Sequence, residues 1–299
     1  MKPYTYSLND IIRADLNKYK DIHMPLKASP IEQYLIKKLY PYRLHVNPED
    51  DFASEKIGPS RTIINNYVNQ MRIFPLGKKG CFEPLIVEKM YPDGYLIING
   101  HHRWAAALQL GKKVPVKIVN LTHESDLDRM LSKAENSRRA AFDLDEVIFC
   151  KNAAEAEKPL PFPLNLFYKE RIRRGVPGLF NALKKRGYDV WVYTSGGYSM
   201  DHIDRLLKKY HVQVTGVVSG GKKIVGNSPL SAEASQRLAR QYHSALHIDA
   251  EAVLYSEGET KTFRHIPLSA SGAEWVQGVL AAVDQLDAGE NGTEGAAER

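Results

Sequence analysis

The chain has 299 residues, of which 43% are hydrophobic and 25% are charged, and its formal net charge at pH 7 is +6. These values are typical of globular proteins and exclude a chain that is disordered throughout. At about 100–200 residues per domain, the length predicts two domains. The only cysteines are Cys81 and Cys150, which excludes a disulfide scaffold and favours a reducing, cytoplasmic setting.

Residues 1–40 predict an N-terminal helical extension. Leu8, Ile11, Ile12 and Leu16 recur at near-helical spacing, and a second run over 31–40 ends before Pro41, which would stop a helix. The N-terminus lacks the apolar stretch of a signal peptide, and no apolar run reaches the ~20 residues of a membrane span. We therefore expect no membrane partner.

Residues 41–139 predict a small α+β domain. The β-branched runs at 84–88 and 95–98 flank a Pro-Asp-Gly turn and indicate a hairpin. An Ala- and Leu-rich helix follows over 101–110, between Gly100 and Gly111, and a strand over 114–120 comes next.

The start of that helix is a candidate phosphate site. Gly100 lets the backbone approach a ligand closely, and the first N–H groups, at His101, His102 and Arg103, carry the positive end of the helix dipole. The Arg103 guanidinium is a bidentate partner for phosphate. The alternative is an ordinary capped helix with exposed polar residues.

A second candidate lies within 48–66. Ser60 is a good N-cap at a predicted helix start, and the acids at 49–51 are candidate bases or metal ligands. The alternative is a charged surface loop.

The pattern over 41–139 resembles the ParB/sulfiredoxin fold. Gly100 and Arg103 match its phosphate-binding box, Gly-x-x-Arg, which an Ala-rich helix follows in that fold. Residues 135–139 resemble a second ParB box, Glu-Asn-x-x-Arg, through Glu135, Asn136 and Arg139.

This resemblance implies a nucleotide-binding domain that takes ATP, ADP or CTP, with the segment near Ser60 helping to hold the nucleotide. His101 stands where the reactive cysteine of sulfiredoxin would fall, so sulfinic acid reduction is not expected. ParB partition proteins continue into a helix-turn-helix domain. A different block follows here, which argues against chromosome segregation and leaves the free serine kinases of this fold as a closer variant.

Residues 140–285 predict a second domain. Apolar strands that end in acidic or hydroxyl residues alternate with helices, which predicts a parallel α/β sheet. The Gly-, Ala- and Glu-rich residues 286–299 predict a disordered tail.

Two carboxylates follow the first strand of this block. Asp143 and Asp145 lie at i and i+2, on one side of an extended chain, at the strand end where such sheets bind ligands. One can attack phosphorus while the other protonates the leaving oxygen, and a divalent cation would relieve their repulsion. The alternative is a pair that only caps the next turn.

Further polar residues follow later strands in a fixed order. They are Thr194 with Ser195, then Lys222 and Lys223, then Asp249 with Glu251. The order of acid pair, hydroxyl, lysine and acid resembles the haloacid dehalogenase-like (HAD) hydrolases, over about 140–285.

The HAD resemblance implies a role for each matching residue. Asp143 would be the nucleophile, Asp145 the general acid and base, Thr194 a phosphoryl ligand, and Lys222 or Lys223 a source of positive charge. Asp249 would hold Mg²⁺ with Asp143 and the backbone carbonyl of Asp145. Glu251 would replace the second acid that the fourth motif normally carries, because Ala250 and Val253 occupy its usual positions.

Only 48 residues separate Asp145 from Thr194, which is too few for a full cap domain as well as the helix before the second strand. The expected fold is therefore α/β with two domains, a ParB/sulfiredoxin-like α+β domain followed by a HAD-like parallel sheet with little or no cap.

The first functional hypothesis is a Mg²⁺-dependent phosphatase with an aspartyl-phosphate intermediate, coupled to a nucleotide-binding domain. Its substrate would be a nucleotide, a nucleic-acid end or a small phosphoester. The second is a nucleotide-dependent kinase or NTPase in the N-terminal domain, with a regulatory HAD domain. The third is a nucleic-acid-associated binding protein, with which the charge of +6 agrees.

Overall fold

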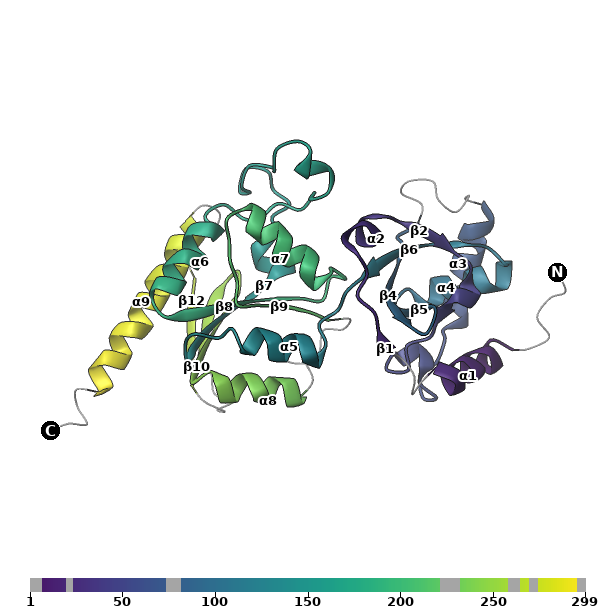
Figure 1. The fold of residues 1–299 in the computed structure, drawn as a ribbon, viewed down its shortest axis with the longest axis horizontal. Coiled ribbons are helices and arrows are strands. Elements are labelled where there is room, and N and C mark those ends of the chain that lie inside the picture. The colour runs from purple at the N-terminus through teal and green to yellow at the C-terminus, as the bar shows by residue number, and fades with distance from the viewer. Residues whose placement is uncertain are drawn as a thin grey trace. The chain divides into compact units, whose positions relative to one another are not determined.

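A computed structural model of the chain describes residues 7–19, 24–73, 82–220, 232–257, 264–268 and 274–294. It divides into two compact units, Met1–Leu121 and Thr122–Arg299. Each unit contains one six-stranded sheet (Figure 1). The two α/β units agree with the expected two-domain class, but the division lies earlier in the chain than the predicted boundary at 139/140.

The first sheet has the strand order β2-β6-β4-β5-β3, and β1 pairs with β4. The strands are β1 (Met24–Pro25), β2 (Lys37–Leu39), β3 (Leu44–His45), β4 (Leu85–Tyr91), β5 (Tyr95–Asn99) and β6 (Val114–Val119). The helices are α1 (Leu8–Tyr19), α2 (Pro30–Tyr34), α3 (Arg61–Ile73) and α4 (His101–Leu110), with short 3₁₀ turns η1 (Pro41–Arg43) and η2 (Asp51–Ala53).

The antiparallel pairing of β4 with β5 confirms the predicted hairpin. Helix α4 is buried along most of its length, because Trp104 and the alanines at 105–107 pack into the first core with Ile64 and Val68 of α3. Residues 1–40 are more than a helical extension, since β1 and β2 lie within them and pair with β4 and β6.

The second sheet has the order β12-β11-β10-β7-β8-β9. Its strands are β7 (Arg138–Asp143), β8 (Tyr188–Thr194), β9 (Gly216–Ser219), β10 (Ser244–Ile248), β11 (Ala252–Glu257) and β12 (Arg264–Pro267). Strands β10, β7, β8 and β9 are parallel, whereas β11 and β12 are antiparallel additions at one edge. The predicted parallel sheet is thus present as a four-stranded core.

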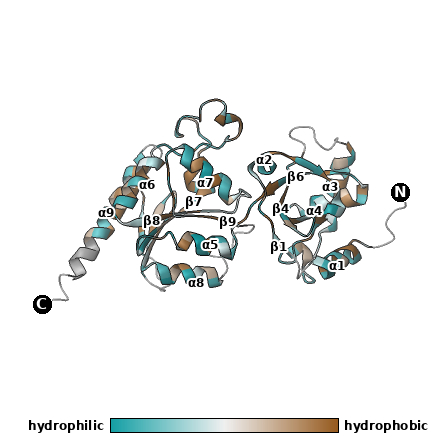
Figure 2. Cartoon of the chain, viewed as in Figure 1, coloured by the Kyte–Doolittle hydropathy of each residue, from teal (hydrophilic) through white to brown (hydrophobic). Residues whose placement is uncertain are grey.

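Helices cover both faces of the second sheet (Figure 1). They are α5 (Glu124–Leu131), α6 (Val176–Lys185), α7 (Met200–Lys209), α8 (Ala232–Gln241) and α9 (Trp275–Glu294). Because both faces are covered, all seven residues of β8 are buried. Figure 2 shows hydrophobic colour along the strands and mixed colour on the surrounding helices, as expected for amphipathic helices on a buried sheet.

Two segments differ from the predicted domain limits. Leu127 and Met130 of α5 are buried in the second core, so residues 122–139 pack with the second sheet. Helix α9 continues to Glu294, and its Leu286 is 2% exposed, so the predicted tail at 286–299 is helical through Glu294. Residues 295–299 lie outside the described part.

Between β7 and α6 the chain makes an insertion over 149–174, which leaves the sheet and returns to it (Figure 1). Isolated bridges join Phe149 to Ile172 and Ala156 to Arg173. No helix in the described part of the chain is long and apolar enough to cross a bilayer.

Candidate functional site

The carboxyl edge of the second sheet gathers the predicted polar residues. Strand β7 ends at Asp143, β8 at Thr194 and β9 at Ser219, and Asp249 directly follows β10. The chain leaves β7 toward β8 on one side and returns as β10 on the other, so the strand order reverses between β7 and β10. Open parallel sheets bind ligands in the crevice at such a point.

Asp143 caps the turn that follows its strand. Its Oδ1 accepts hydrogen bonds from the backbone N–H groups of Asp145, at 2.8 Å, and Glu146, at 2.9 Å. This is the capping role that the sequence left as an alternative. Burial raises the pKa of Asp143 above its usual value, and the negative charge of Asp145 raises it further, while the two backbone donors act in the opposite direction. A half-buried carboxylate is thereby held in place at a strand end.

Asp145 points toward the end of β8. Its Oδ2 accepts hydrogen bonds from Thr194 Oγ1 at 2.9 Å, and from the N–H groups of Ser195 and Gly196 at 3.2 Å each. A Cβ atom at Gly196 would lie 2.5 Å from Asp145 Oδ1, so only glycine leaves room for this contact. The structure therefore brings Asp145 and Thr194 together at the end of β8.

A cavity of about 610 Å³ opens beside Asp145. One wall is the loop after β8, through Ser195, Gly196 and Tyr198, and the other is the insertion. From the insertion the lining residues are Phe149, Cys150, Lys151, Lys169, Glu170 and Arg171. Burial raises the pKa of Tyr198 to about 12, with Glu170 and Asp145 adding to the effect. Its phenol therefore stays protonated at neutral pH.

The insertion holds its shape through its own contacts. Arg171 donates to the carbonyl oxygen of Glu157 through Nε, at 3.0 Å, and Nη2, at 2.6 Å. Arg173 Nε donates to the Val147 carbonyl at 3.0 Å. The insertion's part of the cavity could not be predicted from the sequence, because no motif spacing links residues 149–171 to Asp145.

The four predicted metal-binding carboxylates do not form one group. Ile248 pairs with Phe142, which places Asp249 level with Asp143 on the neighbouring strand. Asp145, however, turns toward β8, on the opposite side of β7. In the part of the chain that the structure describes, no three His, Cys, Asp or Glu side chains lie close enough to hold a metal ion. Glu251 is therefore not gathered with the strand-end acids.

Asp249 has a local role in the turn between β10 and β11. Its Oδ1 accepts from the Ala250 N–H at 2.6 Å, and its own N–H donates to the Ala252 carbonyl at 2.9 Å. Lys222 and Lys223, the predicted positive charges, lie outside the described residues.

In the first unit, the arginine of the predicted phosphate-binding box at the start of α4 is engaged in hydrogen bonds within the protein. The Arg103 guanidinium donates to the carbonyls of Glu83 and Pro84 and to Asn99 Oδ1, and the side chain is 9% exposed. Burial lowers its pKa. Gly100 has a φ of +106°, and a Cβ there would meet Leu85 and Arg103. Arg103 thus ties α4 to the segment before β4. We expected its guanidinium to be open to a phosphate, and the structure shows it buried.

The two histidines of the box accept hydrogen bonds from neighbouring loops. The Asn47 N–H donates to His101 Nε2 at 3.3 Å, and the Ser60 N–H donates to His102 Nε2 at 3.1 Å. Burial lowers the pKa of His102, which favours the neutral ring that can accept. Ser60 is the predicted N-cap, since its Oγ accepts from the Ile63 N–H at 3.4 Å. Ser60 and the box are therefore adjacent, as the resemblance implied.

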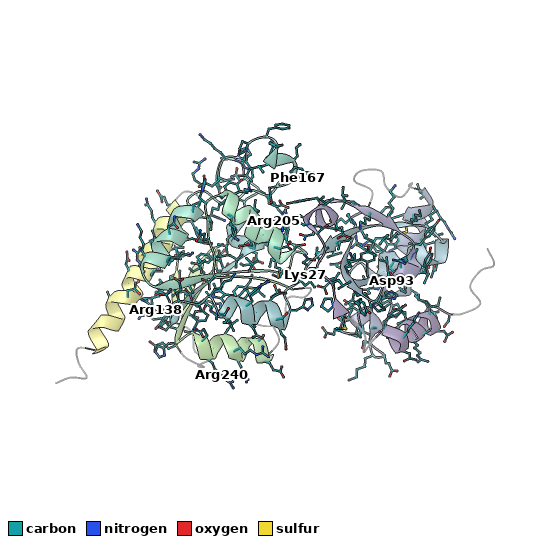
Figure 3. All side chains as sticks on the ribbon, in the orientation of Figure 1. Lys27, Asp93, Arg138, Phe167, Arg205 and Arg240 are labelled. Atoms are coloured by element: carbon teal, nitrogen blue, oxygen red, sulfur yellow. The ribbon has the colours of Figure 1, made fainter. Side chains whose placement is uncertain are left out.

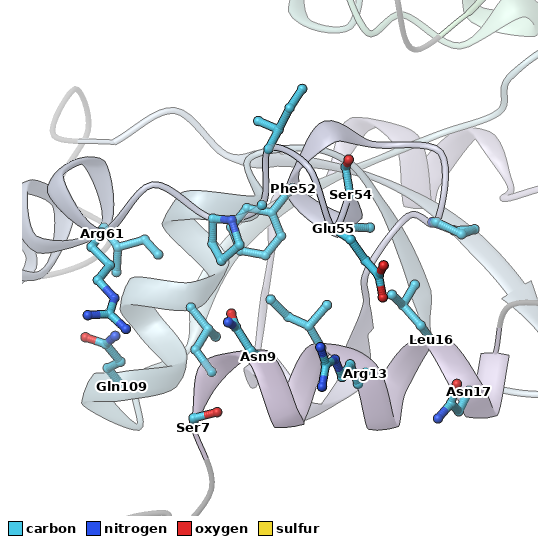
Figure 4. A pocket seen from close by; sticks show the side chains of 18 of the residues that line it. Ser7, Asn9, Arg13, Leu16, Asn17, Phe52, Ser54, Glu55, Arg61 and Gln109 are labelled. Atoms are coloured by element: carbon cyan, nitrogen blue, oxygen red, sulfur yellow. The ribbon is translucent and has the colours of Figure 1, made fainter.

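A cavity of about 830 Å³ lies close to this region. Figure 4 shows Asn9 and Arg13 of α1 facing the loop that carries Phe52, Ser54 and Glu55, with Arg61 and Gln109 at one end. The position of α1 at this cavity could not be predicted from the sequence, because helical periodicity does not show which loop a helix faces.

The second predicted ParB box lies in the second unit, where its residues contact side chains of β8. Asn136 Nδ2 donates to Asp189 Oδ1 at 2.8 Å, and the Glu135 N–H donates to Asp189 Oδ2 at 3.2 Å. Arg139 donates to the Tyr193 hydroxyl at 3.2 Å. Asp189 is 4% exposed, so these contacts satisfy a buried carboxylate at the start of β8.

Comparison with known families gives one match. Residues 31–136 match the ParB N-terminal domain, which supports the ParB/sulfiredoxin-like resemblance of the first block. The match begins before the predicted start at 41 and ends within the second box. No curated protein and no solved structure matches the chain. The HAD resemblance of the second block has no counterpart in these comparisons.

Proposed function

We propose that the second unit hydrolyses phosphate monoesters through a covalent intermediate on Asp143. The observation that carries the proposal is the arrangement of Asp143 and Asp145 at one sheet edge, with Asp145 held by Thr194 and two backbone N–H groups beside a cavity of about 610 Å³. Open parallel sheets bind ligands at this edge.

In the first step, a carboxylate oxygen of Asp143 forms a bond to phosphorus while the ester oxygen leaves. The carboxyl of Asp145 gives its proton to that oxygen, so the product departs as an alcohol. In the second step, a water molecule attacks the phosphorus of the aspartyl-phosphate. Asp145, now a carboxylate, takes the proton from this water, and inorganic phosphate leaves with Asp143 restored.

The hydrogen bonds around Asp145 support its two roles. Thr194 and the amides of Ser195 and Gly196 fix the Asp145 side chain beside the cavity. The same hydroxyl and amides are donors of the kind that bind phosphoryl oxygens.

We include Mg²⁺ in the proposal, with fewer protein ligands than the sequence implied. The carboxylates of Asp143 and Asp249 follow neighbouring strands, and Mg²⁺ commonly binds through one or two carboxylates together with substrate phosphate. These two residues and the backbone carbonyl of Asp145 would hold it, without the side chains of Asp145 and Glu251. When bound, the ion would offset negative charge on the phosphoryl oxygens.

The test is phosphate release from an aryl phosphate by the full chain. We expect Asp143→Asn to reduce the rate to background, and Asp145→Asn to reduce it by about 10²–10⁴-fold, the usual range for a general acid. Asp204→Asn is the matched control, since the contact of the Asp204 side chain within the described residues is an exposed ion pair with Lys208 on α7. An unchanged rate for Asp143→Asn would refute the mechanism.

A chelator and added MgCl₂ test the metal separately. Loss of activity with the chelator, and recovery with MgCl₂ in the wild type but not in Asp249→Asn, would support the ligand assignment. Activity that does not respond to the chelator would remove the metal from the proposal and leave the nucleophile in place.

We also propose that the first unit binds a nucleotide, as the ParB N-terminal match and the cavity of about 830 Å³ support. Arg13 and Arg61 line this cavity and are candidates for the phosphate contacts. A kinase or NTPase activity at this site is the alternative function that the sequence raised.

Titration of ATP, ADP and CTP against the full chain tests this second site. We expect Arg61→Ala to weaken binding of the preferred nucleotide about 10–100-fold, since a hydrogen bond to a charged group contributes about 1.5–3 kcal/mol. Arg72→Ala, on the exposed last turn of the same helix, is the control. Equal affinities for wild type and Arg61→Ala would remove Arg61 from the site, and ATP hydrolysis in the same samples would favour the NTPase alternative.

A further inference from the structure

The insertion over 149–174 carries exposed aromatic rings. Leu160, Tyr168 and Ile172 are buried and anchor it to the second unit. Phe162 and Phe167 are 78% and 49% exposed. Figure 3 labels Phe167 on this insertion.

These rings are concentrated at one place. Among the described residues of the second unit, the exposed large hydrophobic side chains are Phe162, Leu166 and Phe167, all within one turn of the insertion. The turn is ordered by its backbone, since the Tyr168 N–H donates to the Leu164 carbonyl at 2.9 Å and the Phe167 N–H donates to the same carbonyl at 3.0 Å. An exposed apolar cluster on an ordered turn marks an interaction surface.

The charge of the insertion indicates what this surface binds. Residues 149–174 contain six Lys and Arg and three Glu. Arg171 and Arg173 are engaged with backbone carbonyls, whereas Lys151, Lys158 and Lys169 are exposed. Exposed rings among exposed lysines suit a polyanion with flat apolar faces, because bases stack on aromatic side chains and phosphates attract lysines.

The aromatic turn is continuous with the proposed phosphatase site. Lys169, two residues after Phe167, lines the cavity beside Asp145, and so does Lys151 at the start of the insertion. A terminal phosphate in this cavity would leave the adjoining nucleotides next to the insertion. In a duplex only the terminal base pair has an open face, whereas the successive bases of a single strand can each stack on a ring, so two rings favour a single strand.

We propose that the insertion binds the phosphorylated end of a single-stranded nucleic acid, with bases stacked on Phe162 and Phe167 and the terminal phosphate in the cavity beside Asp145. The inference rests on the proposed phosphatase function, whose substrate class it names.

Binding is tested first, on the full chain with Asp143→Asn to prevent turnover. The probe is a fluorescein-labelled, 5′-phosphorylated oligothymidylate of about ten nucleotides, within the usual site size for single-strand binding. We expect the double variant Phe162→Ala, Phe167→Ala to bind about 30-fold more weakly or worse, from the loss of stacking under two bases.

Two further double variants separate stacking from general apolar contact. Replacement of both phenylalanines by Trp keeps a ring and should keep affinity within about threefold, while replacement by Leu keeps apolar surface without a ring and should weaken binding as Ala does. Because both positions are exposed, all three variants should fold, which thermal unfolding checks. Wild-type affinity in the Ala or Leu pair would overturn the inference.

Turnover distinguishes the inference from the function on which it rests. In the otherwise wild-type chain, the Ala pair should lower kcat/KM for 5′- or 3′-phosphorylated oligonucleotides and leave kcat/KM for an aryl phosphate unchanged. Hydrolysis of the aryl phosphate with no preference for either oligonucleotide would overturn the inference alone. Oligonucleotide binding that depends on the rings, without hydrolysis of any substrate, would support the surface and refute the phosphatase. Binding to phosphatidic acid vesicles but not to the oligonucleotides would overturn the inference in favour of a lipid surface.

Discussion

The start of α4 in the first unit and the carboxyl edge of the second sheet carry similar polar groups but use them differently. At α4, Arg103 is 9% exposed and donates to two carbonyls and an amide oxygen. At the sheet edge, Asp145 is held by three donors yet still lines a cavity of about 610 Å³. A polar residue can serve a ligand only when its position leaves it open to one, and sequence motifs do not record this.

The largest expected effect tests whether Arg103, at the start of α4, has a structural role. Arg103→Ala removes the hydrogen bonds from a buried guanidinium to the carbonyls of Glu83 and Pro84, and a hydrogen bond from a charged group contributes about 1.5–3 kcal/mol. We expect the first unit to lose about 3 kcal/mol of stability. Hydrogen exchange of α4 measures it, with Arg72→Ala as the control. If α4 keeps its protection and only nucleotide affinity falls, Arg103 is a ligand-binding residue and not a structural one.

The next prediction tests the position of Asp145 at the carboxyl edge of the second sheet. Gly196→Ala places a Cβ 2.5 Å from Asp145 Oδ1, so the carboxylate must move away from it. A misplacement of about 1 Å in a catalytic group can lower the rate by about 10²-fold. Gly178→Ala is the matched control, because a Cβ at Gly178 in α6 meets nothing within 4 Å. Aryl phosphate hydrolysis is the readout. Equal activity for the two variants would show that the position of Asp145 does not matter for the reaction.

A smaller effect comes from the burial of Asp143. Its folded pKa lies above its unfolded value, so the native state binds more protons than the unfolded chain between the two pKa values, and stability falls as pH rises through that window. Asp143→Asn keeps an oxygen that can accept the two N–H bonds and removes the buried charge. We expect its Tm at pH 7 to exceed that of the wild type by about 2 °C, and the gain to disappear below the unfolded pKa. A lower Tm at pH 7 would contradict this.

The smallest effect is expected at Glu32, which closes the capping box of α2 with Ser29 and contacts Lys37 and Lys89. The backbone N–H of Ser29 contributes most to holding the pKa of Glu32 at about 2. A depressed pKa stabilises the fold above the unfolded value of 4.5, and this stabilisation is lost as pH falls toward 2. Because the side chain is partly exposed, Glu32→Gln should cost only about 0.5–1 kcal/mol at pH 7. Urea denaturation at pH 7 and pH 3 should show the difference shrinking.

Local patterns predicted the elements near both sites well. The hairpin of β4 and β5, the helix between Gly100 and Gly111, and the strands ending at Asp143 and Thr194 follow from β-branched runs, glycine signals and apolar strands. The division between units was harder to place. It depends on which core receives the apolar face of α5, and periodicity shows only that such a face exists.

The sequence by itself determined which chemical groups stand at the strand ends and helix starts, because strand and helix periods and turn residues are local properties of the chain. Only the tertiary structure decided which groups meet. It placed Asp145 against Thr194 and away from Asp249, closed Arg103 onto backbone carbonyls, and set the insertion over 149–174 against the cavity. These outcomes depend on strand order, register and the satisfaction of buried hydrogen bonds, which arise from contacts between distant segments.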